Sequence, residues 1–127
     1  MNRVLGRILG FRYHLFLGRR RFPIISSQIE EYRDYDYQKN LFNHYVSEKG
    51  LEYALSCSAK PGHSEHQTGL AIDVEGSNMD YDNFDKSNEF EWMRENAHKF
   101  GFIMRYPKNR EHITRFKYEP WHYRYVG

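Results

Sequence analysis

The most informative segment of this chain is Ser64-Glu65-His66-Gln67-Thr68-Gly69-Leu70-Ala71-Ile72-Asp73-Val74. Its second half, residues 70–74, is an apolar run that predicts a buried strand. A carboxylate inside such a strand is costly unless it is paired or bound to a cation. Asp73 is therefore a candidate metal ligand, and His66 in the loop before the strand is a second candidate.

A second segment near the C-terminus, Glu119-Pro120-Trp121-His122, adds another histidine and another carboxylate. A catalytic zinc needs three protein ligands of the histidine or carboxylate type and an open position for water. His66, Asp73 and His122 supply that number. Glu119 could take the proton of a water whose pKa the metal lowers. Together the two segments predict a zinc site that hydrolyses an amide.

Two helices are predicted on either side of the first segment. Apolar residues recur at helical spacing over residues 35–47, and Gly50 is placed to end that helix. A second helix is predicted over residues 88–100, with Ser87 as its N-cap and Gly101 as its stop.

The remaining elements are predicted strands. They cover residues 70–74, 102–106, 113–118 and 121–126, with a turn at Lys108-Asn109. This order of elements predicts an α+β fold with a mostly antiparallel sheet.

The two segments, extended to residues 61–74 and 118–127, resemble the signatures of the zinc D-alanyl-D-alanine carboxypeptidases. The similarity is to the vancomycin-resistance type and to the related L,D-carboxypeptidases. It implies a hedgehog/D,D-peptidase-like fold, a small sheet with helices packed on one side and zinc at its open face. It also divides the chain into a divergent N-terminal segment, residues 1–31, and a catalytic domain, residues 32–127.

The resemblance implies a role for each motif residue. In the family, Ser-x-His-x-x-Gly-x-Ala-x-Asp supplies two zinc ligands, and Glu-x-x-His supplies the base and the third ligand. Carried over to this sequence, Zn²⁺ is bound by His66, Asp73 and His122, and Glu119 is the catalytic base. His63 could compete as a ligand, but the family pattern fits only His66.

Residues 32–38 resemble the family stretch Ser-Gly-Tyr-Arg-Ser-x-x-x-Gln, whose arginine and glutamine contact the peptide. The resemblance therefore implies that Arg33 and Gln38 bind substrate, with Ser64 as a hydrogen-bonding partner near zinc. The planar fork of arginine suits a terminal carboxylate. Trp121 is expected to form a wall of the pocket. The alternatives are a surface ion pair for Arg33 and a core position for Trp121.

The sequence departs from the family pattern at two places. Glu30-Glu31 replaces the family's Ser-Gly, and like charge there is expected to weaken the binding of an anionic substrate. Thr114-Arg115-Phe116 replaces Thr-Gly-Tyr, which removes a glycine and a hydroxyl.

The implied function is that of a zinc metallopeptidase, a carboxypeptidase that removes the terminal D-alanine from peptidoglycan stem peptides. Two alternatives stay open. One is an L,D-carboxypeptidase that acts on tetrapeptide stems, and the other is a zinc-bearing module that binds the cell wall without catalysis.

Composition limits the remaining classes of function. The chain has 127 residues, one cysteine and a formal charge of +2, which predicts one domain, no internal disulfide and no nucleic-acid partner. No apolar stretch reaches the length of a transmembrane helix or of a convincing signal peptide. The family resemblance nevertheless implies the cell envelope or the extracellular space. We expect a monomer.

Overall fold

The computed structural model describes residues 29–30, 32–76 and 80–127. Most of the N-terminal segment predicted for residues 1–31 thus lies outside the described residues. In chain order the elements are β1 (Ile29–Glu30), α2 (Tyr35–Lys49), α3 (Leu51–Cys57), η1 (Glu65–Thr68), β2 (Ala71–Val74), η2 (Tyr81–Lys86), α4 (Asn88–Asn96), η3 (Ala97–Phe100), β3 (Phe102–Tyr106), α5 (Glu111–Thr114) and β4 (Glu119–Tyr125). The labels η1 to η3 denote 3₁₀ helices.

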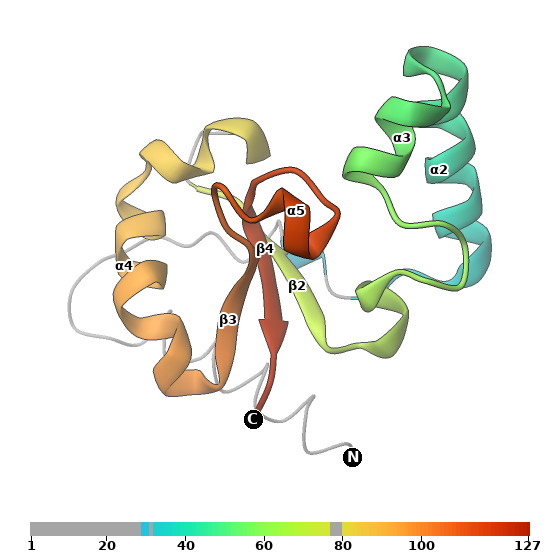
Figure 1. Ribbon diagram of the computed structural model, residues 1–127. Coiled ribbons are helices and arrows are strands. Elements are labelled where there is room, and N and C mark those ends of the chain that lie inside the picture. The colour runs from blue at the N-terminus through green and yellow to red at the C-terminus, as the bar shows by residue number, and fades with distance from the viewer. Residues whose placement is uncertain (1–28, 31, 77–79) are drawn as a thin grey trace.

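The described strands form one antiparallel sheet in the order β1-β2-β4-β3. Figure 1 shows β4 between β3 and β2, so the last strand of the sequence occupies the interior of the sheet. The predicted α+β fold with a mostly antiparallel sheet is confirmed.

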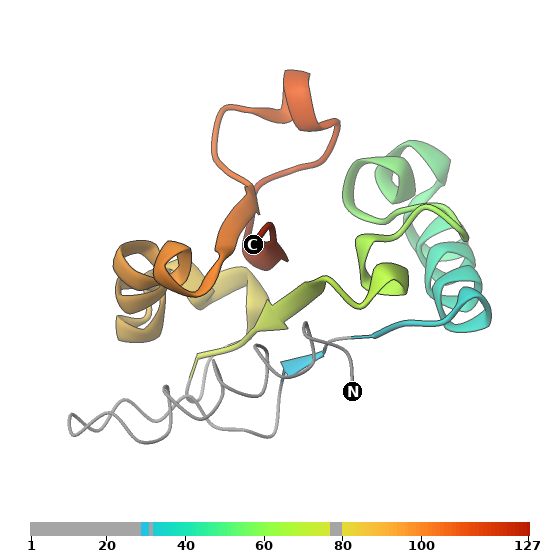
Figure 2. The ribbon, with the colours of Figure 1, turned by 90° about the horizontal axis from the view of Figure 1, so that it is seen from below.

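One face of the sheet packs against the helices that follow β2. The buried core on this face consists of Ile72, Val74, Phe84, Phe90, Met93, Ala97, Phe102 and Tyr123. Successive side chains of a strand point to opposite faces. Asp73 and His122 therefore lie on the other face, away from this apolar core. Figures 1 and 2 place α4 on one side of the sheet and the α2–α3 pair on the other.

The helix predicted over residues 35–47 is present as α2, which extends to Lys49. The Asp34 side chain caps it by accepting a hydrogen bond from the Tyr37 N–H at 2.7 Å. Gly50 ends it with φ +85°, a conformation that favours glycine. Helix α3 starts again directly after this glycine and is missing from the prediction, which took Gly50 as the end of helical structure.

The helix predicted over residues 88–100 is present in two parts, since α4 tightens into the 3₁₀ helix η3 at Ala97. Ser87 is the N-cap as expected, and its Oγ accepts from the Phe90 N–H at 3.0 Å. Gly101 ends η3 with φ +82°. A Cβ at this position would lie 2.8 Å from a ring carbon of Tyr125, so only glycine fits without a shift of the surrounding atoms.

The strand predicted over residues 113–118 is wrong. Residues 111–114 form the short helix α5, and Arg115 follows with φ +69° and ψ +3°, which breaks an extended path. Ile113 is 65% exposed and therefore has no core to join. Strand β4 begins at Glu119, slightly earlier than the predicted start at Trp121. Strand β3 and the turn at residues 108–109 match the prediction.

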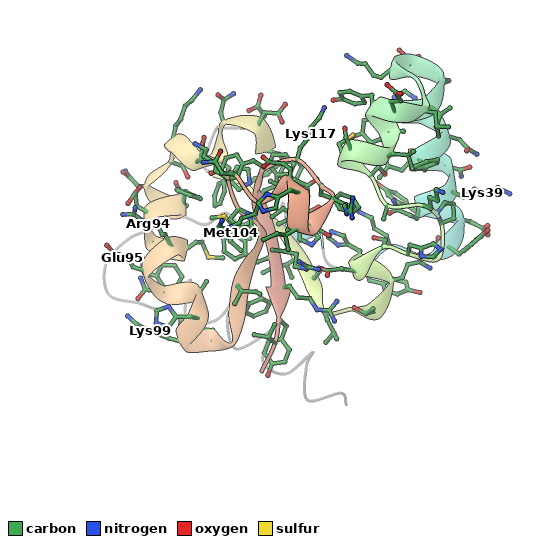
Figure 3. All side chains as sticks on the ribbon, in the orientation of Figure 1. Lys39, Arg94, Glu95, Lys99, Met104 and Lys117 are labelled. Atoms are coloured by element: carbon green, nitrogen blue, oxygen red, sulfur yellow. The ribbon has the colours of Figure 1, made fainter. Side chains whose placement is uncertain are left out.

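Charged residues lie on the outer surface of α4 and η3. Arg94, Glu95 and Lys99 are exposed and project away from the sheet (Figure 3). Within the described parts of the chain, no helix has both the length and the apolar character that a bilayer span requires.

Candidate metal centre

Three residues with metal-type donor atoms meet on the sheet face that carries Asp73. His66 comes from η1, Asp73 from β2 and His122 from β4. The His66 Nε2 lies 3.2 Å from the Asp73 Oδ2, and the His122 Nδ1 lies 3.0 Å from the Asp73 Oδ1. The three side chains are buried, and the two imidazole rings meet edge to face with their centroids 5.0 Å apart.

Local structure places each of these donors. Ser64 is the N-cap of η1, and its Oγ accepts from the His66 N–H at 3.3 Å, which fixes the turn that presents His66. The chain then enters β2 after Gly69. Asp73 and His122 are partners in the register between β2 and β4, so their side chains lie side by side on one face.

The donor set fits a zinc ion. Zinc bonds of about 2.0–2.2 Å in a tetrahedral arrangement separate neighbouring donors by about 3.4 Å. The donor atoms here all lie within 4.8 Å of one another, and the two imidazoles approach the two Asp73 oxygens at 3.2 and 3.0 Å. Burial raises the pKa of Asp73, but hydrogen bonds from His122 and His66 outweigh it and hold this pKa below its usual range. Asp73 is therefore a buried anion suited to a cation.

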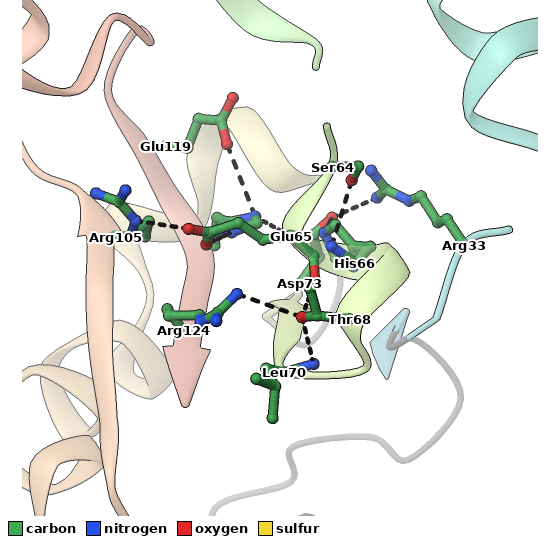
Figure 4. Close-up of polar contacts among 11 residues, drawn as sticks. Arg33, Ser64, Glu65, His66, Thr68, Leu70, Asp73, Arg105, Glu119 and Arg124 are labelled. Carbon is green, nitrogen blue, oxygen red and sulfur yellow. Dashed lines mark hydrogen bonds and ion pairs between the residues drawn. The ribbon is translucent and has the colours of Figure 1, made fainter. Parts of the chain in front are cut away.

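Glu119 lies beside this cluster, with its Oε2 3.9 Å from the His122 Nδ1 (Figure 4). The side chain is buried, and burial raises its pKa to about 7, although the nearby His122 opposes this rise. A carboxyl group with a pKa near neutrality can both accept and return a proton at physiological pH.

Two of the residues predicted to bind substrate lie in the pocket that contains the His66–Asp73–His122 cluster. The Arg33 Nη2 donates to the Asp73 Oδ2, so the guanidinium reaches the metal-type cluster itself. Gln38 is 1% exposed, and its Nε2 donates to the Ser58 Oγ and to the Ala59 carbonyl oxygen. Its Oε1 has no hydrogen-bond partner among the described residues, although it is buried.

A pocket of about 340 Å³ joins all of the predicted site residues. Its lining includes Arg33, Gln38, Ser64, His66, Asp73, Glu119, Trp121 and His122. Trp121 also packs against the apolar core and contacts the Tyr81 ring at 5.9 Å between centroids, so it serves the wall and the core together. His63 is exposed and is not part of the cluster.

Three further residues of the site were missed by the sequence analysis. Glu65 contacts the His122 Nε2 at 3.2 Å, Arg105 donates from its Nε to Glu65 at 2.8 Å, and the Tyr106 ring lies 4.9 Å from that of His122. Glu65 stands next to His66 in the motif, and this position was the available signal. Nothing in the sequence indicates Arg105 or Tyr106, which the fold brings in through β3.

The two departures from the family pattern differ in how they relate to the pocket. Arg115 is exposed and does not line it, whereas its neighbour Phe116 does and stacks on Tyr106. The backbone of Glu30 pairs with that of Asp73 across β1 and β2. Glu31 lies outside the described residues.

Comparison with known proteins gives a consistent family. The family model described as VanY, D-alanyl-D-alanine carboxypeptidase, matches residues 18–127. YodJ of Bacillus subtilis (strain 168) is 48% identical over 102 residues, 78% of this chain and 37% of YodJ. A D-alanyl-D-alanine carboxypeptidase of Enterococcus faecium is 46% identical over 96 residues, 76% of this chain and 28% of that enzyme. The chain thus spans about a third of these relatives.

Solved structures agree with the sequence relatives. The LdcB LD-carboxypeptidase superposes with a TM-score of 0.79 at 38% identity, over 98% of this chain and 57% of LdcB. VanYB in complex with D-alanine-D-alanine superposes with a TM-score of 0.78 at 32% identity, over 98% of this chain and 70% of VanYB. A mutant of the D,D-pentapeptidase VanY in complex with Zn(II) superposes with a TM-score of 0.76 at 31% identity, over 98% of this chain and 71% of that chain. On this evidence, the chain belongs to the VanY family of D-alanyl-D-alanine carboxypeptidases.

Proposed function

We propose that this chain is a zinc-dependent carboxypeptidase that releases the terminal D-alanine from peptidoglycan stem peptides. The observation that carries the proposal is the meeting of three metal-type donors with a buried carboxyl group, Glu119, in one pocket. Two relatives support it, since one VanY structure contains Zn(II) and the VanYB structure contains D-alanine-D-alanine.

In this proposal His66, Asp73 and His122 hold the ion. Bound zinc supplies Lewis-acid chemistry, because it acidifies water and stabilises negative charge that develops on an amide oxygen. The apolar core behind the cluster keeps the ligands in place, since β2 and β4 are both anchored in it.

Glu119 is the proposed base. Its carboxylate takes the proton of the attacking water and then gives a proton to the amine nitrogen of the leaving D-alanine. A pKa of about 7 suits both transfers, since neither form of the group is strongly favoured at neutral pH.

Arg33 is the proposed anchor of the substrate's terminal carboxylate. Its guanidinium contacts Asp73, which is itself a carboxylate. Arg33 also lines the pocket, and its planar fork of donors suits a substrate carboxylate there. Gln38 and Ser64 offer further hydrogen bonds from the pocket wall, and the Trp121 ring offers an apolar surface for an alanyl methyl group.

The direct test has three steps on the full chain. Elemental analysis should give one zinc per chain, and incubation with a pentapeptide stem ending in D-alanyl-D-alanine should release free D-alanine. Removal of the metal with a chelator should stop the release, and added zinc should restore it. Release that persists after the metal has been removed would refute the proposal.

An L,D-carboxypeptidase is a second candidate, which the similarity to the LdcB LD-carboxypeptidase favours. The same assay with a defined tetrapeptide stem separates the two activities, because only an L,D enzyme releases D-alanine from it. A zinc-bearing binding module is the third candidate. Stoichiometric zinc without cleavage of either stem would favour this module. The buried Glu119 argues against it, since a structural zinc site needs no base.

A further inference from the structure

Glu65 stands between two motif residues but faces a different side of the site. Its Oε2 lies 3.2 Å from the His122 Nε2, whereas the other ring nitrogen of His122 faces Asp73 at 3.0 Å. The carboxylate of Glu65 thus meets the ring nitrogen of His122 on the side opposite to the one that faces Asp73.

Both oxygens of this carboxylate are engaged. Arg105, on the neighbouring strand β3, donates from its Nε to the Glu65 Oε1 at 2.8 Å. The guanidinium in turn lies over the Tyr106 ring, 5.3 Å from its centroid. Glu65 is therefore fixed by three elements, η1, β3 and β4, and its side chain is only 19% exposed.

This geometry has a consequence for the state of His122. A histidine that binds a metal through one ring nitrogen carries its proton on the other, and a carboxylate that accepts this proton fixes the orientation of the ring. Here the Nδ1 faces the donor cluster, so the proton belongs on the Nε2, where Glu65 accepts it.

We propose that Glu65, held by Arg105, is a positioning residue that orients His122 so that its Nδ1 points at the metal. This inference rests on the proposed zinc site and deepens it. The competing account is that the Glu65–Arg105 ion pair only stabilises the packing of η1 against β3 and has no effect on metal affinity.

The test is the zinc dissociation constant of the full chain, measured by competition with a chromophoric chelator. Glu65→Met, which removes the acceptor, should weaken zinc binding about 10- to 100-fold. Glu65→Gln keeps one oxygen and should lose less, as should Arg105→Met, which leaves the carboxylate in place but loose. Glu91→Gln is the matched control, because Glu91 forms an exposed 2.7 Å ion pair with Arg94 on α4 and should bind zinc normally.

A second readout separates the orientation of His122 from the stabilisation of the packing between η1 and β3. The visible absorption of the Co²⁺-loaded chain should change in Glu65→Met, since this signal reports ligand geometry, and thermal unfolding of the metal-free variants measures that stabilisation. Zinc affinity within about twofold of the wild type would overturn the inference, with or without a lower melting temperature. If Glu65→Met does not fold, wild-type affinity in both Glu65→Gln and Arg105→Met overturns it. A wild-type chain that binds no zinc would overturn the proposed function as well.

Discussion

Asp73 and His122 are direct partners across β2 and β4, and the Oδ1 of the aspartate lies 3.0 Å from the Nδ1 of the histidine. Two of the three candidate metal ligands are therefore brought together by the sheet itself. The third, His66, comes from the turn that leads into β2. A site of this kind is as rigid as the strands that carry it, so substitutions of its side chains should change chemistry more than backbone structure.

Glu119→Gln should retain zinc and lose hydrolysis. The amide has nearly the same shape as the carboxylate but cannot accept a proton from water, so turnover should fall about 10²- to 10⁴-fold. His122→Ala should lose both zinc and activity. Elemental analysis and D-alanine release measure the two effects, and full activity in either variant would reject the assigned roles.

The same Glu119→Gln substitution should stabilise the metal-free chain at alkaline pH. Burial raises the pKa of Glu119 from 4.5 to about 7, so the folded state holds a proton that the unfolded state releases. The penalty for ionising this group is absent below about pH 4.5, grows as the pH rises to 7 and is constant above it. It amounts to about 3 kcal/mol at most. Urea unfolding at pH 4.5 and 8 checks this, and an equal difference at both pH values would contradict it.

Zinc affinity should rise with pH. Burial alone would lower the pKa of His122. Hydrogen bonds to Asp73 and Glu65 outweigh this effect and raise the pKa to about 9. A metal must displace that proton, so each unit of pH below 9 should weaken binding about tenfold. Chelator competition at several pH values measures the slope. His63→Ala, at an exposed histidine, should leave it unchanged, and a pH-independent affinity of the wild type would exclude His122 as a ligand.

Arg33→Lys should impair substrate binding more than turnover. Lysine keeps the charge but not the planar fork, and a lost charge-assisted hydrogen bond costs about 1.5–3 kcal/mol, or roughly 10- to 100-fold in KM. Arg94→Lys, at an exposed position on α4, is the control (Figure 3). A substrate whose terminal carboxylate is amidated should be cleaved equally poorly by the wild type and by Arg33→Lys. If the variant still discriminates between acid and amide as strongly as the wild type, Arg33 is not the anchor.

Arg115→Gly should stabilise the chain. Arg115 has φ +69°, a left-handed conformation that costs a residue with a Cβ about 1 kcal/mol, and the resembled family has glycine at this place. The expected gain is a few degrees in melting temperature for the metal-free chain. Asn109→Gly, at φ +62°, should gain less because asparagine tolerates this conformation. A lower melting temperature in Arg115→Gly would show that the arginine side chain contributes more than its backbone strain costs.

Local signals in the sequence predicted much of the fold. Helix boundaries depend on residues within one helical turn, and the sequence predicts three of them, Gly50, Ser87 and Gly101. The cap Asp34 is not among these predictions. Ile113 shows the limit of such signals. Its apolar side chain suggests a strand, yet it is exposed, because it lies on the short helix α5, away from the buried core.

The grouping of the candidate site residues was predictable where a short motif contains them, and it was not predictable where only the fold brings them together. Two short segments contain residue types that indicate metal chemistry, namely His66, Asp73, Glu119 and His122. The contact between Arg105 and Glu65 joins residues that are 40 positions apart, and it depends on the pairing of β3 with β4. No local pattern around Arg105 distinguishes it from the other arginines of the chain.

In the proposed zinc site, the register between β2 and β4 would also make metal binding depend on correct folding. A slip of one residue in this pairing would move every side chain of one strand to the opposite face, so His122 would leave the aspartate and enter the apolar core. An ion that needs both donors binds the in-register chain alone and raises its stability by mass action. Zinc available during refolding should therefore favour the native strand alignment over slipped ones, before any peptide reaches the pocket.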